Sequence, residues 1–309
     1  MKRRVCIGTS SFGSYDERPL DLMREEDLTW DLNPRGRRLE GPELVEFAWE
    51  AVGLIAGNEP LDESTLPYLK RLRVISRCGV GLDNVDLDVA TRCGIRVFNT
   101  PSAPTPAVAE LTLSVTLSLL RHTSWMDRDL RAGSWKKRMG HLLRGKRVGI
   151  IGFGDIGQEV ARLFQVLGCS LGYADPREID SDLPAPRLGL RELLEWADIV
   201  SVHISGGGRE GPLIGEFELG HMRQGAWLVN LSRGGVVDED ALAASLSSGR
   251  LRGAAIDVFG EEPYSGPLTG YDNVVLTPHV GSYGLEARVD MEIQAVRNLI
   301  EGLRIWDEA

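Results

Sequence analysis

The sequence predicts an α/β fold of two Rossmann-like domains. Short apolar runs alternate with helical patterns along the whole chain, and a glycine motif follows one of the runs. The chain has 309 residues, enough for about two domains with separate hydrophobic cores. We expect a doubly wound parallel sheet in one domain and a flavodoxin-like sheet in the other.

In the first domain, strands and helices are expected to alternate. The apolar runs that predict strands are 4–7, 52–56, 73–76 and 95–98. The helical patterns lie near 41–50, 61–69 and 87–92. Three prolines, Pro101, Pro104 and Pro106, then interrupt the chain, and a long apolar helix is expected from Val108 to Arg121.

Six further strands suit a complete dinucleotide-binding sheet. They are expected near 148–151, 170–174, 198–204, 226–230, 253–258 and 274–277. An amphipathic helix from Leu285 to Ile305 should return to the first domain. The substrate domain is therefore expected to comprise 1–101 and 282–309, and the NAD-binding domain 102–281. Two chain crossings of this kind commonly act as a hinge above a cleft.

A dinucleotide-binding motif lies at the start of the second domain. Gly152, Gly154 and Gly157 follow the apolar run Val148 to Ile151 and precede a helical stretch. The three glycines would allow a tight turn, a close approach of backbone N–H groups to a pyrophosphate, and close packing of the helix on the strand. The alternative is a tight strand-to-helix turn that binds no ligand.

An acidic residue follows at the spacing that this motif requires. Asp175 ends a second apolar run, about 20 residues after the motif, where it could accept hydrogen bonds from the adenosine ribose. It would repel a 2′-phosphate, so the sequence favours NAD over NADP, although Arg177 weakens this preference slightly.

Composition and charge exclude several classes of partner. The chain has 45 acidic and 35 basic residues, and its net charge of −10 does not attract nucleic acid. Its four cysteines are scattered, which indicates reduced thiols and neither a disulfide framework nor a metal site. We expect no signal peptide, no membrane-spanning run and no regulatory domain after the last helix. We therefore expect a soluble, cytoplasmic protein.

Three polar residues follow strands of the second sheet, at the edge where such sheets bind ligands. Arg233 follows the strand near 226–230, Glu262 follows that near 253–258, and His279 follows that near 274–277. A histidine can give a proton to the carbonyl oxygen of a 2-keto acid, and a nearby carboxylate would orient it and favour its protonated form. Arg233 can hold the substrate carboxylate, and the cofactor supplies the hydride.

Each of these residues also has an ordinary structural explanation. Arg233 could be a solvated or capping residue, Glu262 part of a surface turn, and His279 a strand-end cap. Their placement at strand ends of one nucleotide-binding sheet favours catalysis. His203 also ends a strand and is expected near the cofactor. Asp257 could bind the nicotinamide amide, tune the histidine, or only satisfy local backbone N–H groups.

Taken together, these segments resemble the D-isomer-specific 2-hydroxyacid dehydrogenases, and most closely their D-3-phosphoglycerate dehydrogenase-like branch. The matching segments, in the family's order, are Arg77 to Asp86, Asn99 to Pro101, Val108 to Glu110, Gly152 to Gly157, Val229 to Gly235, Gly253 to Pro263 and Asn273 to His279. The resemblance implies that Arg233, Glu262 and His279 are catalytic. It also implies a homodimer built on the nucleotide domain, with Val108 to Arg121 near the interface.

The resemblance extends to binding residues. It implies that loops around Asn58 and at Gly79, Val80 and Gly81 offer backbone N–H groups to the substrate carboxylate, together with Arg233. The positions expected to bind the cofactor are Gly152, Gly154, Asp155, Ile156, Gly157, Asp175, His203, Ser232 and Asp257. The chain departs from the family at Ser205 to Gly208, where a Pro-Leu-Thr segment is usual, so cofactor contacts of this loop are in doubt.

The expected activity is hydride transfer between NAD(H) and a D-2-hydroxy acid or 2-keto acid, with a substrate like 3-phosphoglycerate as one option. Glutamate at position 262 argues against formate oxidation, for which relatives carry glutamine. Open alternatives are an NAD-sensing corepressor, a phosphite- or phosphonate-linked dehydrogenase, and an inactive nucleotide-binding paralogue. Basic residues of the first domain could bind a substrate phosphate or lie on a solvated face: Arg35, Arg37, Lys70, Arg71 and Arg77.

Overall fold

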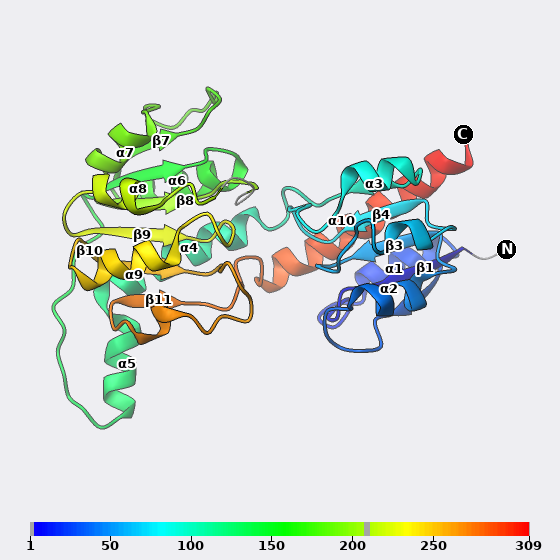
Figure 1. Cartoon of the computed structure of the whole chain (residues 1–309), viewed down its shortest axis with the longest axis horizontal. Helices are drawn as coiled ribbons and strands as arrows, with labels where there is room; N and C mark the ends of the chain where they lie inside the picture. The colour runs from blue at the N-terminus through cyan, green and yellow to red at the C-terminus, as the bar shows by residue number, and fades with distance from the viewer. Residues whose placement is uncertain (1–2, 207–210, 309) are drawn as a thin grey trace. The chain divides into compact units, whose positions relative to one another are not determined.

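The computed structural model describes residues 3–206 and 211–308 (Figure 1). The chain divides into two compact units. The first unit comprises Met1–Pro104 and Ser282–Ala309, and the second comprises Thr105–Gly281. Each unit contains one parallel sheet, so the predicted α/β class with two Rossmann-like domains is confirmed.

The first unit has a five-stranded parallel sheet in the order β2-β1-β3-β4-β5. Its strands are β1 (Arg4–Ile7), β2 (Thr29–Leu32), β3 (Gly53–Ala56), β4 (Val74–Arg77) and β5 (Arg96–Phe98). The chain runs to one side of β1 to form β2, and then to the other side for the later strands. Loops at the carboxyl ends of β1 and β3 therefore lie at the point where such sheets bind ligands.

Helices cover both faces of this sheet. They are α1 (Arg18–Glu25), α2 (Gly41–Ala48), the 3₁₀ helix η1 (Leu66–Tyr68), α3 (Leu87–Arg92) and α10 (Leu285–Asp307). One apolar core includes Leu44, Leu66 and Val89 from α2, η1 and α3. The other core includes Met23 from α1 and Leu299 from α10. The last helix of the chain is thus part of the unit that the first residues build.

Sequence reasoning was wrong about the segment near 61–69. Only η1 forms there, preceded by an isolated bridge between Leu61 and Val85. Proline at position 67 disfavours the α conformation of Leu66, which explains the shorter 3₁₀ turn. The predictions also lacked α1 and the short edge strand β2, neither of which has a strong apolar run.

The second unit contains all six predicted strands in one parallel sheet, ordered β11-β10-β9-β8-β6-β7. They are β6 (Arg147–Ile151), β7 (Ser170–Ala174), β8 (Ile199–Val202), β9 (Ala226–Asn230), β10 (Leu251–Ile256) and β11 (Val274–Leu276). The chain order reverses between β6 and β8, so the loops that follow these two strands flank the expected dinucleotide crevice.

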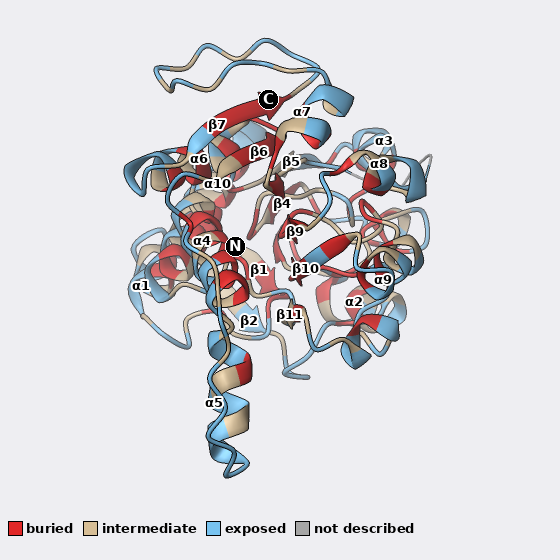
Figure 2. Cartoon of the chain, turned by 90° about the vertical axis from the view of Figure 1, so that its left-hand side faces the viewer, coloured by how far each residue is buried: buried red, intermediate tan, exposed pale blue. Residues whose placement is uncertain are grey.

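The helices of the second unit form a layer on each side of the sheet. They are α4 (Thr105–Arg121), α5 (Thr123–Arg131), α6 (Asp155–Val166), α7 (Leu190–Trp196), α8 (Glu216–His221), α9 (Glu239–Ser247) and the 3₁₀ helix η2 (Pro267–Gly270). α4 and α6 share one apolar core, and α7, α8 and α9 share the other. Figure 2 shows buried strands and a largely exposed α5.

α4 begins at Thr105, before the predicted start at Val108. Pro106 therefore lies in the first turn of the helix and does not interrupt it, because a proline there removes no helical hydrogen bond. None of the helices within 3–206 and 211–308 combines the length and apolar character needed to cross a membrane.

Candidate active site

The glycine loop between β6 and α6 has the geometry that a dinucleotide requires. Gly152 has φ of +86°, and a Cβ atom there would lie 2.4 Å from the carbonyl oxygen of His203. A Cβ atom at Gly157 would lie 2.1 Å from the carbonyl oxygen of Gly152. Both positions therefore require glycine.

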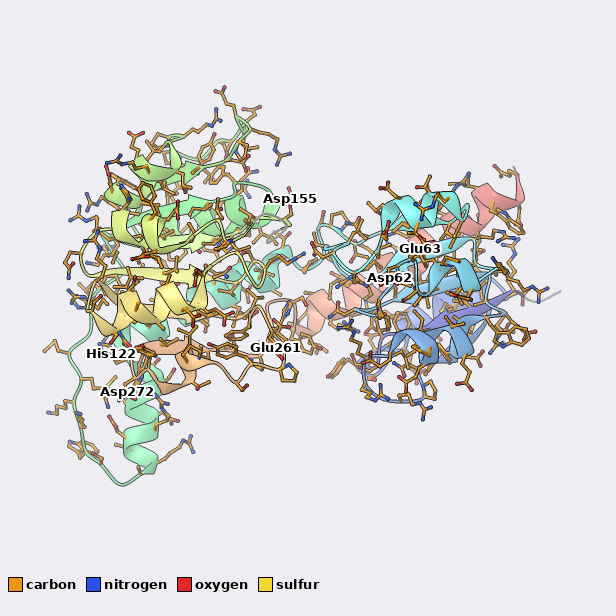
Figure 3. The ribbon with its side chains drawn as sticks, viewed as in Figure 1. Asp62, Glu63, His122, Asp155, Glu261 and Asp272 are labelled. Carbon is orange, nitrogen blue, oxygen red and sulfur yellow. The ribbon has the colours of Figure 1, made fainter. Side chains whose placement is uncertain are left out.

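Gly154 differs from these two because the space above it is open. No atom of residues 3–206 and 211–308 lies within 4 Å of a Cβ placed there, and Gly154 is the N-cap residue of α6. Asp155 begins the helix, as Figure 3 shows, and Ile156 follows it. The first N–H groups of α6 thus remain available, and the loop fits a pyrophosphate at a helix N-terminus.

Asp175 lies directly after β7, next to this loop. Its carboxylate accepts hydrogen bonds from the backbone N–H groups of Phe153, at 3.0 Å, and Arg177, at 2.9 Å. Burial acts to raise the pKa of Asp175, but these hydrogen bonds and the Arg177 guanidinium outweigh burial and lower it. The residue is therefore a fixed anion beside the glycine loop. Asp175 is thus in direct contact with the glycine loop.

His203 follows β8, on the other side of the reversal point from β7. Its Nε2 lies 2.7 Å from Ser201 Oγ, and its buried Nδ1 has no hydrogen-bond partner among residues 3–206 and 211–308. Burial lowers the pKa of His203 to about 3, so the ring is neutral at physiological pH. The nearby departure from the family pattern begins at Ser205, and its residues 207 and 208 lie outside the described ranges.

The loop after β9 carries Ser232 and Arg233 and is held by Asn230. The N–H and Oγ of Ser232 both donate to Asn230 Oδ1, at 3.1 and 2.7 Å. Asn230 Nδ2 donates to the carbonyl oxygen of Arg233 at 3.2 Å, and Arg233 Nη1 donates to the carbonyl oxygen of Ser232 at 2.8 Å. A buried asparagine thus fixes the backbone from which the arginine projects.

Glu262 and His279 contact each other directly. His279 Nδ1 lies 2.8 Å from Glu262 Oε2 and 3.1 Å from Oε1. Side-chain exposures of 38% for Glu262 and 47% for His279 leave the pair reachable from solvent. With Nδ1 directed at the carboxylate, Nε2 is left to exchange a proton with a substrate. This arrangement is that of a histidine general acid–base and its orienting carboxylate.

Asp257 holds the turn that presents His279. Its Oδ1 accepts hydrogen bonds from Thr277 Oγ1 and the N–H of Val280, and its Oδ2 accepts from the N–H of Gly281, at 2.6 to 2.9 Å. His279 has φ of +53°, which is rare for a residue other than glycine. Both oxygens of Asp257 are therefore engaged in keeping the histidine in this conformation, and its side chain is buried.

The expected substrate loops lie in the first unit, and two of their N–H groups already have acceptors. The N–H of Gly79 donates to Thr100 Oγ1 at 2.8 Å, and that of Gly57 donates to Glu59 Oε2 at 2.6 Å. Both N–H groups are thus already engaged within the loops, and the binding of a substrate carboxylate by these loops stays a prediction. Glu59 is buried, and a buried carboxylate requires such donors.

A guanidinium group lies in the same loop cluster. Arg77 Nη2 donates to Asn58 Oδ1, and Arg77 Nη1 donates to the carbonyl oxygen of Cys78 at 2.6 Å. A Cβ at Gly79 would overlap Arg77 Nη1, so the glycine makes room for the cation. Asn99 Nδ2 donates to the carbonyl oxygen of Val80 at 2.7 Å and so fixes the loop that carries Val80 and Gly81.

Sequence reasoning missed the residues that support the site. Asn230 ends a strand next to the serine and arginine, Glu59 follows β3, and Thr100 precedes a proline. No sequence motif marks these three residues, because each acts through a local hydrogen bond. Only their position at strand ends could have indicated that they support the site. Gly234 was seen only as part of the arginine loop.

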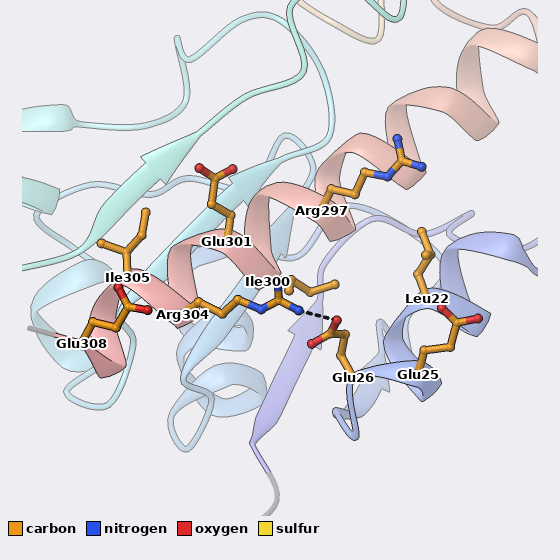
Figure 4. Close-up of a pocket in the computed structure, with 9 residues that line it drawn as sticks. All are labelled: Leu22, Glu25, Glu26, Arg297, Ile300, Glu301, Arg304, Ile305 and Glu308. Carbon is orange, nitrogen blue, oxygen red and sulfur yellow. Dashed lines mark hydrogen bonds and ion pairs between the residues drawn. The ribbon is translucent and has the colours of Figure 1, made fainter.

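A separate pocket of about 430 Å³ lies in the first unit between α1 and α10 (Figure 4). It contains none of the predicted site residues. Its lining is mostly charged, and Arg304 forms an ion pair with Glu26 there. Within 3–206 and 211–308, no three His, Cys, Asp or Glu side chains gather in a way that could hold a metal ion.

Known proteins are similar to most of this chain. The profile of the NAD binding domain of D-isomer specific 2-hydroxyacid dehydrogenases matches residues 113–281. A hydroxypyruvate reductase from Thermotoga maritima is 38% identical over 291 residues, which cover 92% of this chain and 94% of the relative. A glyoxylate reductase from Thermococcus gammatolerans is 38% identical over 316 residues, covering 97% and 92%.

Solved structures agree with these matches. The crystal structure of a glyoxylate reductase from Paecilomyes thermophila has a TM-score of 0.87 and 28% sequence identity, and covers 96% of this chain and 94% of that one. These relatives bear the names of glyoxylate and hydroxypyruvate reductases, and they do not support the expected phosphoglycerate dehydrogenase-like branch.

Proposed function

This chain belongs to the family of D-isomer-specific 2-hydroxyacid dehydrogenases, which are NAD(P)-dependent enzymes, and we propose that it reduces small 2-keto acids with NADH. The contact between Glu262 and His279 carries the proposal, because it provides an oriented proton donor at the carboxyl edge of the nucleotide-binding sheet. The names of the relatives favour glyoxylate and hydroxypyruvate as substrates.

The residues of this chain divide the chemistry between them. The cofactor, when bound, supplies the hydride to the carbonyl carbon of the substrate. His279 gives the carbonyl oxygen a proton from Nε2 in reduction and removes it in oxidation. Glu262 fixes the ring through Nδ1 and stabilises the protonated form. The guanidinium of Arg233 holds the substrate carboxylate and polarises the carbonyl.

Cofactor binding is assigned to the loops around β6. The open space above Gly154 and the N-terminus of α6 receive the pyrophosphate, and Asp175 receives the adenosine ribose. His203, Ser232 and Asp257 lie after the neighbouring strands toward the nicotinamide end. Burial keeps His203 neutral, so it adds no positive charge beside the cofactor.

Asp175 should determine the choice of cofactor. We expect kcat/KM to favour NADH over NADPH by about tenfold or more, roughly 1.4 kcal/mol, because a 2′-phosphate would meet the carboxylate. Asp175→Ser should relax the preference by removing this repulsion. Initial rates with both cofactors test this, and equal use of the two by the parent protein would show that Asp175 does not face the ribose.

The pH dependence of the rate should reveal the Glu262–His279 pair. Keto acid reduction should fall as pH rises, and hydroxy acid oxidation should fall as pH drops, because the two directions need opposite protonation states of His279. Glu262→Gln should move both midpoints to lower pH, since the negative charge beside the imidazole is lost. Unchanged pH–rate profiles in Glu262→Gln would show that another residue, and not Glu262, is the partner of His279.

The substrate class can be tested with a panel of 2-keto acids. NADH oxidation should be rapid with at least one acid among glyoxylate, hydroxypyruvate and their phosphorylated analogues. If the protein preferred a phosphorylated keto acid and Arg77→Ala removed this preference, the result would favour a phosphoglycerate-like substrate. A protein that binds NADH but oxidises it with no keto acid would instead fit the corepressor or the inactive paralogue.

We also propose that the chain forms a homodimer through the second unit. Helix α4 leaves Leu117 partly exposed, and the segment after α5 exposes Trp135, Met139 and Leu142. Large apolar side chains gathered in one segment are typical of an interface. Light scattering after size-exclusion chromatography should give twice the mass of the chain, and a monomer would refute this assignment.

A further inference from the structure

The loop that carries Glu262 is anchored at a residue of another element, Glu239. Glu239 is the first residue of α9, whose N-cap is Asp238. The side chain of Asp238 caps the helix by accepting from the N–H of Ala241 at 3.0 Å. Glu239 is therefore not needed for capping, and its Oε1 accepts a hydrogen bond from the N–H of Gly260 at 2.8 Å.

The peptide group next to the one that Glu239 holds orients Glu262. The N–H of Phe259 donates to Glu262 Oε1 at 3.1 Å, so two successive N–H groups bind two different carboxylates. Glu262 Oε2 is thereby directed to His279 Nδ1, at 2.8 Å. Because the two peptide groups are joined at Phe259, we expect a displacement of the Phe259–Gly260 peptide to shift the Phe259 N–H that holds the Glu262 carboxylate.

Two further contacts close this loop. The rings of Phe259 and Tyr264 are stacked, with centroids 4.1 Å apart and an angle of 17° between their planes. Burial raises the pKa of Tyr264, and the charge of Glu239 adds to this effect, which places that carboxylate beside the ring. The segment from Phe259 to Tyr264 is thus a closed loop on the first turn of α9.

The arginine loop contacts the same peptide. A Cβ at Gly234 would lie 1.8 Å from the carbonyl oxygen of Phe259 and 3.0 Å from the nitrogen of Gly260. The residue next to Arg233 therefore has to be glycine for the two loops to pack together. The position of the Phe259–Gly260 peptide sets the geometry of both catalytic loops.

From these contacts we infer that Glu239 is a positioning residue that fixes the Glu262 carboxylate against His279 by holding the N–H of Gly260. The inference rests on the proposed function, because it concerns the same proton-transferring pair. Glu239 does not touch substrate or cofactor in this account, and it acts only through the loop.

Two substitutions separate positioning from charge. Glu239→Asp keeps the charge and suits a helix N-terminus, but the shorter side chain withdraws from Gly260. Glu239→Gln loses the charge but keeps an oxygen at the same reach. We expect Glu239→Asp to move the pH midpoint of keto acid reduction in the same direction as Glu262→Gln, by a part of the shift measured for that variant. Glu239→Gln should keep the parent midpoint.

The matched control is Asp240→Asn, which removes a charge from the next, exposed residue of the same helical turn. It should leave both the midpoint and kcat at parent values. NADH binding, followed by fluorescence, verifies that each variant is folded. A change in the pH–rate profile then cannot be the result of unfolding.

The outcomes distinguish this inference from the proposed function. A shift of the pH midpoint in Glu239→Asp and none in Glu239→Gln supports the positioning role. A shift with Gln and none with Asp would show that Glu239 acts by its charge, and would overturn the inference. The same holds if neither variant shifts the profile while Glu262→Gln does. If Glu262→Gln does not change the pH dependence of keto acid reduction, the proposed function fails and the inference fails with it.

Discussion

Replacing His279 with asparagine should lower kcat for keto acid reduction on the order of 10²-fold or more, the usual scale for a positioned general acid. Asparagine tolerates the left-handed backbone at this position better than most residues, so the loss would report the missing proton donor more than backbone strain. Steady-state rates at saturating NADH give the size of the effect.

NADH affinity is the control for this variant, because His279 is assigned to proton transfer and not to the nucleotide. It should change little. A variant that kept kcat within about tenfold of the parent would contradict the assigned role, since the proton would then have another source.

Arg233→Ala should be the second large effect. We expect kcat/KM for keto acids to fall on the order of 10²-fold, because two charge-assisted hydrogen bonds to the substrate carboxylate are worth about 3 kcal/mol together. Arg233→Lys should recover little of this loss, as lysine keeps the charge without the planar fork. Kinetics with a keto acid and binding titrations with NADH measure the two properties separately.

The structure also provides a control for Arg233. Asn230→Ala leaves the guanidinium in place but removes the hydrogen bonds that hold its loop. It should therefore weaken keto acid turnover less than Arg233→Ala. Near-normal kcat/KM of Arg233→Ala for every acid that the parent reduces would rule out its contact with substrate.

The second unit could be predicted closely because its signals are local. Its strands are short buried runs, and the glycine loop, the acid after β7 and the three strand-end residues all occupy fixed positions in a parallel sheet. The direct contact between Glu262 and His279 follows from the adjacency of β10 and β11. Sequence order and sheet geometry were sufficient there.

The first unit was harder to predict because tertiary contacts determine its short elements. β2 is an edge strand with little apolar character, and the expected helix near 61–69 is reduced to a 3₁₀ turn by Pro67. The N–H groups of Gly57 and Gly79 could not be known to have acceptors, because Glu59 and Thr100 meet them only in the folded loops. No sequence motif identifies these hydrogen-bond acceptors.

Transfer of deuterium from the cofactor tests the central claim most directly. The protein would be incubated with a 2-keto acid that it consumes and NADH carrying two deuterium atoms at C4 of the nicotinamide, and the product analysed by mass spectrometry and NMR. The account predicts a 2-hydroxy acid with deuterium at C2, since the hydride goes to the carbonyl carbon and His279 adds only a solvent-exchangeable proton to oxygen. A hydroxy acid without deuterium at C2, or no hydroxy acid with any keto acid of the panel, would contradict it.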